Sequence, residues 1–395
     1  MTPRHLYIHA PFCARRCSYC DFAVTVDRAP RAGPWLDALE RELAGLIERN
    51  GWSGIELRTI YVGGGTPSLF GPSVMADLAA RLRGLTDMTG LIEWTAEANP
   101  EHFDAELAID WRNAGIGRLS LGAQTFDPAV LAWMGRLHAV DGPMRAIGAA
   151  RSAGFEDISV DLIFGLPGRL GRDWSADLDR VVDLETEHVS LYGLTAEPAA
   201  PLGRWVEEGR ERLADPETYA DEYLEAAARL AAAGFGHYEV SNFAKPGRES
   251  RHNQAYWEGG AYIGLGPGAH SSVPPRRWWN VRDHATWAAR LDCGDSAIED
   301  EEVVTGDAAV LEQAWLQLRT WAGALCRTAG QRDLARMWEE RGLAAIDGDR
   351  VTLTPAGWLI LDKLAVDFAD RDLNADAGSQ TLTDPRFRTE ACSTG

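Results

Sequence analysis

The chain has 395 residues, of which 45% are hydrophobic and 25% charged, as in an ordinary soluble protein with two or three domains. Its formal net charge of −20 argues against nucleic-acid binding, because a negative surface repels phosphate backbones, and its six cysteines are too few for a disulfide scaffold. No apolar run approaches the roughly 20 residues of a membrane span and the start lacks a signal peptide's apolar segment, so we expect a cytoplasmic protein, with peripheral membrane contact left open.

Short β-type runs alternate with helix-type stretches over the first half of the chain. The predicted strands cover residues 5–11, 57–65, 92–100, 118–125, 157–168 and 188–195. The predicted helices cover residues 34–50, 72–84 and 104–115, a stretch that ends at Gly154, and residues 173–185. Successive β-then-α units with compact turns predict an α/β fold, in which a parallel sheet is covered by helices or curled into a partial barrel.

Polar residues stand where these predicted strands end. They are Cys13, Gly63 to Thr66, Glu97, Asn99, Gln124 and Thr195, and Asp161 lies within the fifth strand. The carboxyl ends of parallel strands form the active face of barrel and other α/β folds. We therefore expect these groups to lie together at the carboxyl-terminal end of the sheet or barrel.

The alternation fades after residue 200. A predicted helix at 215–234 leads into residues 237–271, which are rich in glycine, aromatic and polar residues and suit a lid or loop region. Two further helical runs and a hairpin centred on Asp347 and Gly348 look like a small winged-helix module. We therefore expect a core at 1–200, an appended α+β region at 201–302, a C-terminal winged-helix-like domain at 303–373 and a disordered tail at 374–395.

Half of the cysteines stand in one short stretch, spaced C-x3-C-x2-C as Cys13, Cys17 and Cys20. A zinc site would need a fourth ligand such as His9, and zinc sites more often use paired C-x2-C elements. A redox dithiol made of Cys17 and Cys20 would leave Cys13 without a role. A cluster of four irons held by three thiolates would keep one iron open for a further ligand.

With an aromatic residue, Tyr19, just before its last cysteine, this motif resembles the cluster motif of the radical S-adenosylmethionine (SAM) enzymes. The resemblance implies a partial (β/α)6 TIM barrel with a [4Fe–4S] cluster on the three cysteines and the amine and carboxylate of SAM on the open iron. In that family one electron from the cluster cleaves SAM to methionine and a 5′-deoxyadenosyl radical. The glycine triplet at 63–65, which alone predicts only a tight turn, resembles the segment that holds the SAM amine. By the same resemblance the SAM-binding residues are Tyr7, Tyr19, Gly64, Gly65, Thr66, Glu97, Gln124, Arg136 and Asp161.

Longer stretches narrow the resemblance to the HemW/HemN branch, over most of residues 5–370. Two of them are VDLIFGLPG at 160–168 and LYGLTAEPAAPL at 191–202. This branch contains the oxygen-independent coproporphyrinogen III dehydrogenase and the HemW-type haem chaperones. The dehydrogenase has a further cysteine two residues after the trio, where this chain has Phe22, and a long extension before its cluster motif. Both departures favour the chaperone type.

HemW-type proteins share an H-N-x-x-Y-W motif linked to haem binding, which is present here as His252, Asn253, Tyr256 and Trp257. Imidazole is a common axial ligand of haem iron and aromatic side chains pack on porphyrin faces, although such a histidine can also simply hydrogen-bond a loop. The resemblance implies that His252 contacts haem. His270 is a second candidate for the same pocket.

The resemblance as a whole implies a haem chaperone that binds a [4Fe–4S] cluster, SAM and haem, accepts an electron from a donor and delivers haem to an acceptor protein. The enzyme alternative is the dehydrogenase, which abstracts hydrogen from propionate side chains and oxidatively decarboxylates them to vinyl groups. Whether the chain is an enzyme stays open at this point. A zinc-stabilised or redox scaffold is a third class. The other cysteines have no metal-like spacing and are interpreted as ordinary thiols: Cys293, Cys326 and Cys392.

Overall fold

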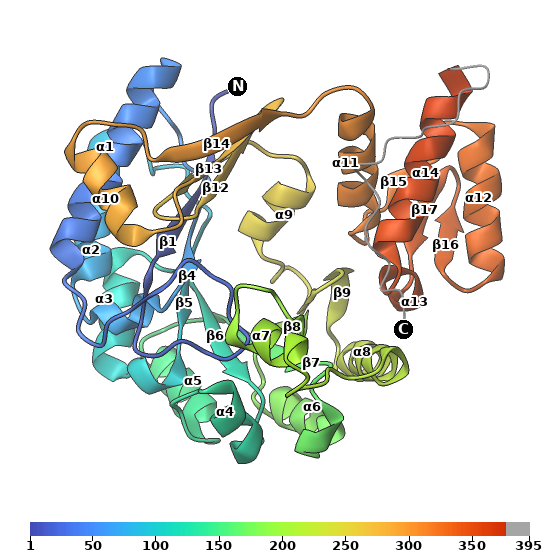
Figure 1. The fold of residues 1–395 in the computed structure, drawn as a ribbon, viewed down its shortest axis with the longest axis horizontal. Coiled ribbons are helices and arrows are strands. Elements are labelled where there is room, and N and C mark those ends of the chain that lie inside the picture. Colours follow the sequence, from blue (N-terminus) through green and yellow to red (C-terminus); the bar gives the residue numbers. More distant parts are fainter. Residues whose placement is uncertain (377–395) are drawn as a thin grey trace. The chain divides into compact units, whose positions relative to one another are not determined.

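The computed structural model describes residues 1–376, which belong to two compact units (Figure 1). The first unit holds Met1–Val304 together with Arg319–Trp321, and the second holds Thr305–Leu318 and the chain from Ala322 onward. The predicted division of the first unit at residue 200 stays a prediction.

The first unit is built on one twelve-stranded sheet, whose order is β14-β13-β12-β11-β1-β4-β5-β6-β7-β8-β10-β9. Six neighbouring strands within it run parallel and in chain order. They are β1 (His5–Ala10), β4 (Thr59–Gly64), β5 (Glu93–Ala98), β6 (Arg118–Gln124), β7 (Asp157–Phe164) and β8 (His188–Gly193). Side chains on both faces of these strands are mostly buried, as expected of parallel strands covered by other elements. The predicted strands and the α/β fold are confirmed.

Helices alternate with these strands along the chain and lie on the outer side of the curved sheet in Figure 1. Asp104 caps the first turn of one of them, α3, by accepting a hydrogen bond from Leu107 N at 3.0 Å, and Gly115 ends it in the left-handed conformation. The helices of this part are α1 (Ala32–Asn50), α2 (Val74–Leu85), α3 (Ala105–Ala114), α4 (Pro128–Met134), α5 (Gly142–Ser152) and α6 (Trp174–Asp183). Short 3-10 helices follow three of the strands: η1 (Pro67–Phe70), η2 (Pro100–His102) and η3 (Gly168–Leu170).

The appended residues extend the same sheet on both sides. Parallel pairing joins β11 to β1, and antiparallel pairing joins β10 to β8. Their strands are β9 (Gly236–Glu239), β10 (Asn242–Ala244), β11 (Tyr262–Leu265), β12 (His270–Val273), β13 (Arg276–Asn280) and β14 (Ile298–Val303), and their helices are α7 (Pro201–Glu207), α8 (Pro216–Ala232), α9 (Arg251–Trp257) and α10 (His284–Asp292). The expected lid or loop region at 237–271 is therefore wrong. Its strands are too short and too rich in glycine to show a period of two in the sequence, and pairing with distant strands stabilises them.

The second unit combines helices with a small antiparallel sheet of order β15-β17-β16. Its elements are α11 (Asp307–Leu318), β15 (Ala324–Leu325), α12 (Ala329–Glu340), β16 (Ala344–Asp347), β17 (Arg350–Leu353), α13 (Pro355–Trp358) and α14 (Leu361–Asp376). The expected helical runs and the hairpin at Asp347 and Gly348 are present, while the finer likeness to a winged helix stays a prediction. Of the tail predicted at 374–395, residues 374–376 end α14 and the rest lies outside the described residues. Among residues 1–376, no helix combines the length and the apolar character of a membrane span.

Candidate functional site

The carboxyl ends of the parallel strands surround a cavity of about 380 Å³, which we call the cysteine cavity. Most of the predicted site residues line it: Cys13, Cys17, Tyr19, Cys20, Gly64, Gly65, Thr66, Glu97, Gln124, Arg136 and Asp161. Tyr7 does not line this cavity and lies in a neighbouring one. The convergence expected from the strand ends is therefore observed, because parallel strands bring their carboxyl ends to one edge of the sheet.

Cys13 ends the two-residue strand β2 (Phe12–Cys13), Cys17 and Cys20 lie on the loop between β2 and β3 (Thr25–Val26), and all three thiols are free. Thr66 Oγ1 donates to Cys13 Sγ at 3.5 Å, and Arg136 Nη1 donates to Cys17 Sγ at 3.9 Å. Burial raises the pKa of Cys13 to about 11 and also raises that of Cys20. A metal centre that binds these sulfurs must therefore displace protons from them.

His9, the suggested fourth zinc ligand, is buried and both of its ring nitrogens are engaged. Its Nε2 contacts Ala23 O at 2.9 Å, and its Nδ1 contacts the Tyr7 hydroxyl at 3.1 Å. Within residues 1–376, no three His, Cys, Asp or Glu side chains are placed to hold one metal ion. A four-iron cluster places each thiolate on a different iron and does not require such convergence. His9 is therefore not available as a fourth zinc ligand in this structure.

The glycine triplet packs against the end of β1. A Cβ atom on Gly65 would lie 2.5 Å from Ala10 O and 2.7 Å from Phe12 O, so a side chain there would collide with backbone. Gly64 has a φ of 99° and donates its N–H to Glu97 Oε2 at 3.0 Å. Close backbone packing at Gly65 and the positive φ of Gly64 thus require glycine beside the cysteine loop, whether or not a ligand is bound.

Two partly buried carboxyl groups, Glu97 and Asp161, face the cysteine cavity. Glu97 accepts hydrogen bonds from the Tyr61 hydroxyl at 2.9 Å and from Gly64 N at 3.0 Å. Burial, together with the negative charge of Asp161, raises the pKa of Glu97 to about 7. Burial also raises the pKa of Asp161, although hydrogen bonds from Ser190 and Ser120 oppose the rise. Such a pair suits a ligand that brings positive charge, as the sulfonium and amine of SAM would.

Asn99 is a site residue whose role the sequence did not reveal. Its Nδ2 donates to Thr66 Oγ1 at 3.1 Å, and its Oδ1 accepts from Arg136 Nη2 at 2.7 Å, so it links the groups that contact Cys13 and Cys17. The signal available in the sequence was its spacing, two residues after Glu97, which is typical of side chains on one face of an extended segment.

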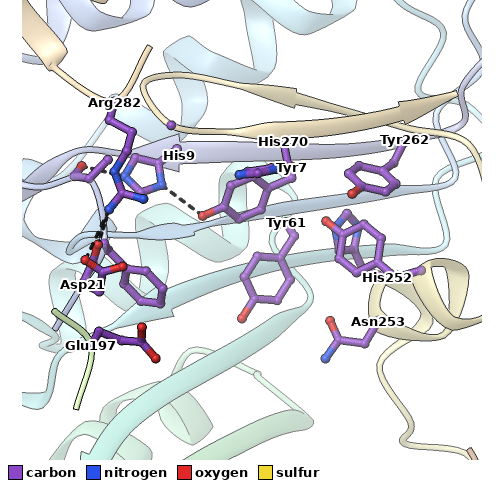
Figure 2. A pocket seen from close by; sticks show the side chains of 14 residues that line it. Tyr7, His9, Asp21, Tyr61, Glu197, His252, Asn253, Tyr262, His270 and Arg282 are labelled. Atoms are coloured by element: carbon purple, nitrogen blue, oxygen red, sulfur yellow. Dashed lines mark hydrogen bonds and ion pairs between the residues drawn. The ribbon is translucent and has the colours of Figure 1, made fainter. Parts of the chain in front are cut away.

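A second cavity of about 590 Å³, the aromatic cavity, adjoins the first (Figure 2). Its volume falls within the roughly 300–1,000 Å³ that is usual for cofactor sites. Its lining includes four tyrosines, two predicted haem candidates and an arginine: Tyr7, Tyr61, Tyr256, Tyr262, His252, His270 and Arg282. Asp21, Phe22 and Glu197 line both cavities and form a shared wall.

The H-N-x-x-Y-W motif forms helix α9, which begins after the N-cap residue Ser250. Its first amides, Arg251 N and His252 N, donate to the buried carboxylate of Glu93 at 2.7 and 3.0 Å. Glu93 thus stabilises the positive end of this helix from strand β5. This contact could not be predicted from the sequence, because the partners are more than 150 residues apart in the chain.

His252 is buried in α9, with a partner on each ring nitrogen. Its Nδ1 contacts Thr59 Oγ1 at 2.7 Å, and its Nε2 contacts the Tyr256 hydroxyl at 2.7 Å. Burial and the nearby His5 and Arg118 lower the pKa of His252 to about 3, so its ring is neutral. The spacing in the motif is explained by this contact, since residues four apart lie on one face of a helix.

Comparison with known proteins agrees with this geometry. The sequence pattern of the Radical SAM superfamily matches residues 7–181. The chain is 39% identical over 368 residues to "Heme chaperone HemW" of Mycobacterium tuberculosis (strain ATCC 25618 / H37Rv), covering 91% of this chain and 93% of that protein. It is 35% identical to "Heme chaperone HemW" of Bacillus subtilis (strain 168), and the match covers 80% of this chain and 83% of that protein. Among solved structures, coproporphyrinogen III oxidase (HemN) from Escherichia coli matches with a TM-score of 0.79 and 22% identity, over 93% of this chain and 90% of that one, which shows a shared fold.

Proposed function

Because the chain belongs to the HemW family of radical SAM proteins, we propose that it is a haem chaperone, which binds a [4Fe–4S] cluster, SAM and haem and passes haem to an acceptor protein. The proposal is carried by one observation: the cysteine cavity and the aromatic cavity lie next to each other and share the lining residues Asp21, Phe22 and Glu197. One presents three free thiols, and the other presents aromatic rings and imidazoles. An electron donor and the haem acceptor are its proposed partners.

In the cysteine cavity, Cys13, Cys17 and Cys20 would hold the cluster, and two side chains partly offset the burial that raises the pKa of Cys13. Arg136 places a positive charge near Cys17, and Thr66 donates to Cys13. When bound, the cluster supplies an open iron for SAM and a single electron. The other proposed SAM-binding residues are Tyr7, Tyr19, Gly64, Gly65, Glu97, Gln124 and Asp161.

Haem, the cargo, fits the aromatic cavity. Tyrosine rings offer flat apolar surfaces for a porphyrin, and the guanidinium of Arg282, which is paired with Asp21, adds a positive charge beside the cavity for a propionate. His252 also lines this cavity from α9, and its Nε2 contacts the hydroxyl of Tyr256, whose ring would face the haem.

Phe22 bears on the choice between a chaperone and the dehydrogenase. Its side chain is 60% exposed and lies on the wall shared by the two cavities. An apolar ring at this position cannot ligate a metal, whereas the cysteine of the dehydrogenase could. The chain's own residue therefore favours the chaperone.

Anaerobic reconstitution followed by haem titration tests this function. We expect about four irons per chain, an electron paramagnetic resonance (EPR) spectrum of the reduced cluster that changes when SAM is added, and saturable haem binding. A preparation that holds only zinc would overturn the cluster, and a reconstituted protein that does not bind haem would overturn the chaperone. Turnover of coproporphyrinogen III with SAM and a reductant would instead establish the dehydrogenase.

A further inference from the structure

Three histidines line the aromatic cavity, and they differ in whether a ring nitrogen is available to a metal: His9, His252 and His270. Both nitrogens of His9 and both of His252 are engaged with protein partners, as described above. In the described part of the chain, neither ring nitrogen of His270 has a hydrogen-bond partner from the protein. His270 is therefore the lining imidazole that can bind iron without first breaking a hydrogen bond.

The surroundings of His270 keep its imidazole neutral and accessible. The side chain is exposed on the cavity side, so an incoming ligand can reach it. Partial burial and the positive charges of Arg282 and Arg277 lower the pKa of His270. A neutral imidazole has the lone pair that a metal requires.

The backbone at His270 is held in place on both sides. Across the hairpin, His270 pairs with Trp279, and their rings stack with centroids 5.8 Å apart and planes 27° apart. On the other side, a Cβ atom on Gly264 would lie 2.1 Å from His270 O, so only glycine allows this close approach. Gly264 N also donates to Ser271 Oγ at 2.9 Å. A ligand on such a fixed backbone has a defined direction.

Three of the four tyrosines of the cavity are poorer ligands than this imidazole. Burial raises the pKa of Tyr7, Tyr61 and Tyr256, so their phenols stay protonated at neutral pH. A protonated phenol lacks the phenolate oxygen that haem iron binds. In the view of Figure 2, His270 overlaps Tyr7, and His252 lies below Tyr262.

We propose that His270 is the axial ligand of the haem iron in the aromatic cavity, and that His252 is a positioning residue that holds Tyr256. This inference rests on the haem-binding function proposed above. It assigns different tasks to the two histidines, so single variants separate them.

The test is a titration of ferric haem into anaerobically reconstituted wild type, His270→Ala, His252→Ala and Tyr256→Phe, followed by absorption and EPR spectroscopy. We expect His270→Ala to lose the spectrum of histidine-ligated haem and to bind haem at least about tenfold more weakly. Added imidazole should restore the spectrum, because it can replace the missing ring. Iron content and SAM binding of this variant should match those of the wild type, which shows that it has folded.

The two other variants address His252 directly. Tyr256→Phe frees His252 Nε2 while keeping the aromatic ring, and both it and His252→Ala should retain histidine-ligated haem. A His270→Ala protein with an unchanged spectrum would overturn the assignment, as would tighter haem binding by Tyr256→Phe or loss of histidine ligation in His252→Ala. Failure of the wild type to bind haem would overturn the proposed function itself, which is a distinct result.

Discussion

Binding of SAM should depend on pH through the carboxyl group of Glu97. Burial and the charge of Asp161 raise the pKa of this group to about 7, well above that of an ordinary carboxylate. The neutral acid therefore predominates below pH 7 and the carboxylate above it. A ligand that brings a sulfonium and an amine binds the carboxylate better, so affinity should fall as the pH drops through 7.

The size of this effect follows from the pKa. About nine tenths of Glu97 is ionised at pH 8 and about one tenth at pH 6, so affinity should fall about tenfold between them, or about 1.4 kcal/mol. In Glu97→Gln an acceptor for Gly64 N remains, but the side chain can no longer ionise. The roughly tenfold dependence of SAM affinity on pH that Glu97 contributes should therefore vanish in this variant. In Asp161→Asn the neighbouring negative charge is lost, so the midpoint should move to lower pH.

The assay is anaerobic calorimetry of SAM binding to the reconstituted proteins between pH 6 and pH 8. SAM's own amine titrates equally with each protein, so the ratio of wild-type to Glu97→Gln affinity isolates the contribution of Glu97. A ratio that stays constant across this range would refute the reasoning. So would an Asp161→Asn midpoint that is unchanged or higher.

Three further predictions concern the cluster, the glycine triplet and helix α9. Cys17→Ser should lower the iron content below the wild-type value of about four per chain, whereas Cys293→Ser should not, and equal iron contents would contradict the assigned ligands. Gly65→Ala should lower both the iron content and the thermal midpoint, because its Cβ atom would meet the carbonyl of Ala10 at 2.5 Å. The control Gly33→Ala has open space around its Cβ and lies in α1, so it should be neutral or stabilising by about 0.5–1 kcal/mol. Glu93→Ala removes the acceptor for two amides of α9 and should destabilise that helix locally by about 2 kcal/mol. Amide hydrogen exchange in α9 should therefore be faster in this variant. Unchanged protection of these amides would contradict the prediction.

The parallel strands and the cysteine cavity could be predicted from the sequence because their signals are local. Glycine and polar residues end each β-type run. Parallel strands bring those ends to one edge of the sheet, so no knowledge of long-range contacts is needed to predict that they meet. Glu97 and Cys13 are far apart in the chain, yet both were expected at one mouth for this reason.

The aromatic cavity could not be predicted in the same detail, because its contacts join distant segments. Thr59, on strand β4, occupies one nitrogen of His252, and Glu93 on β5 caps the helix that carries it. No local sequence pattern distinguishes Thr59 or Glu93 from other polar residues in strands. The letters of the H-N-x-x-Y-W motif indicated a haem contact, but not that His252 is already engaged on both sides.

The pairing of β11 with β1 and of β10 with β8 has a consequence for any attempt to isolate the core. Without the appended strands, β1 and β8 would become edge strands, and their unpaired amides and carbonyls would be open to solvent. Exposed edges of this kind are templates for association with another chain. We therefore expect a fragment cut after residue 200 to aggregate, because both edges of its sheet would be exposed.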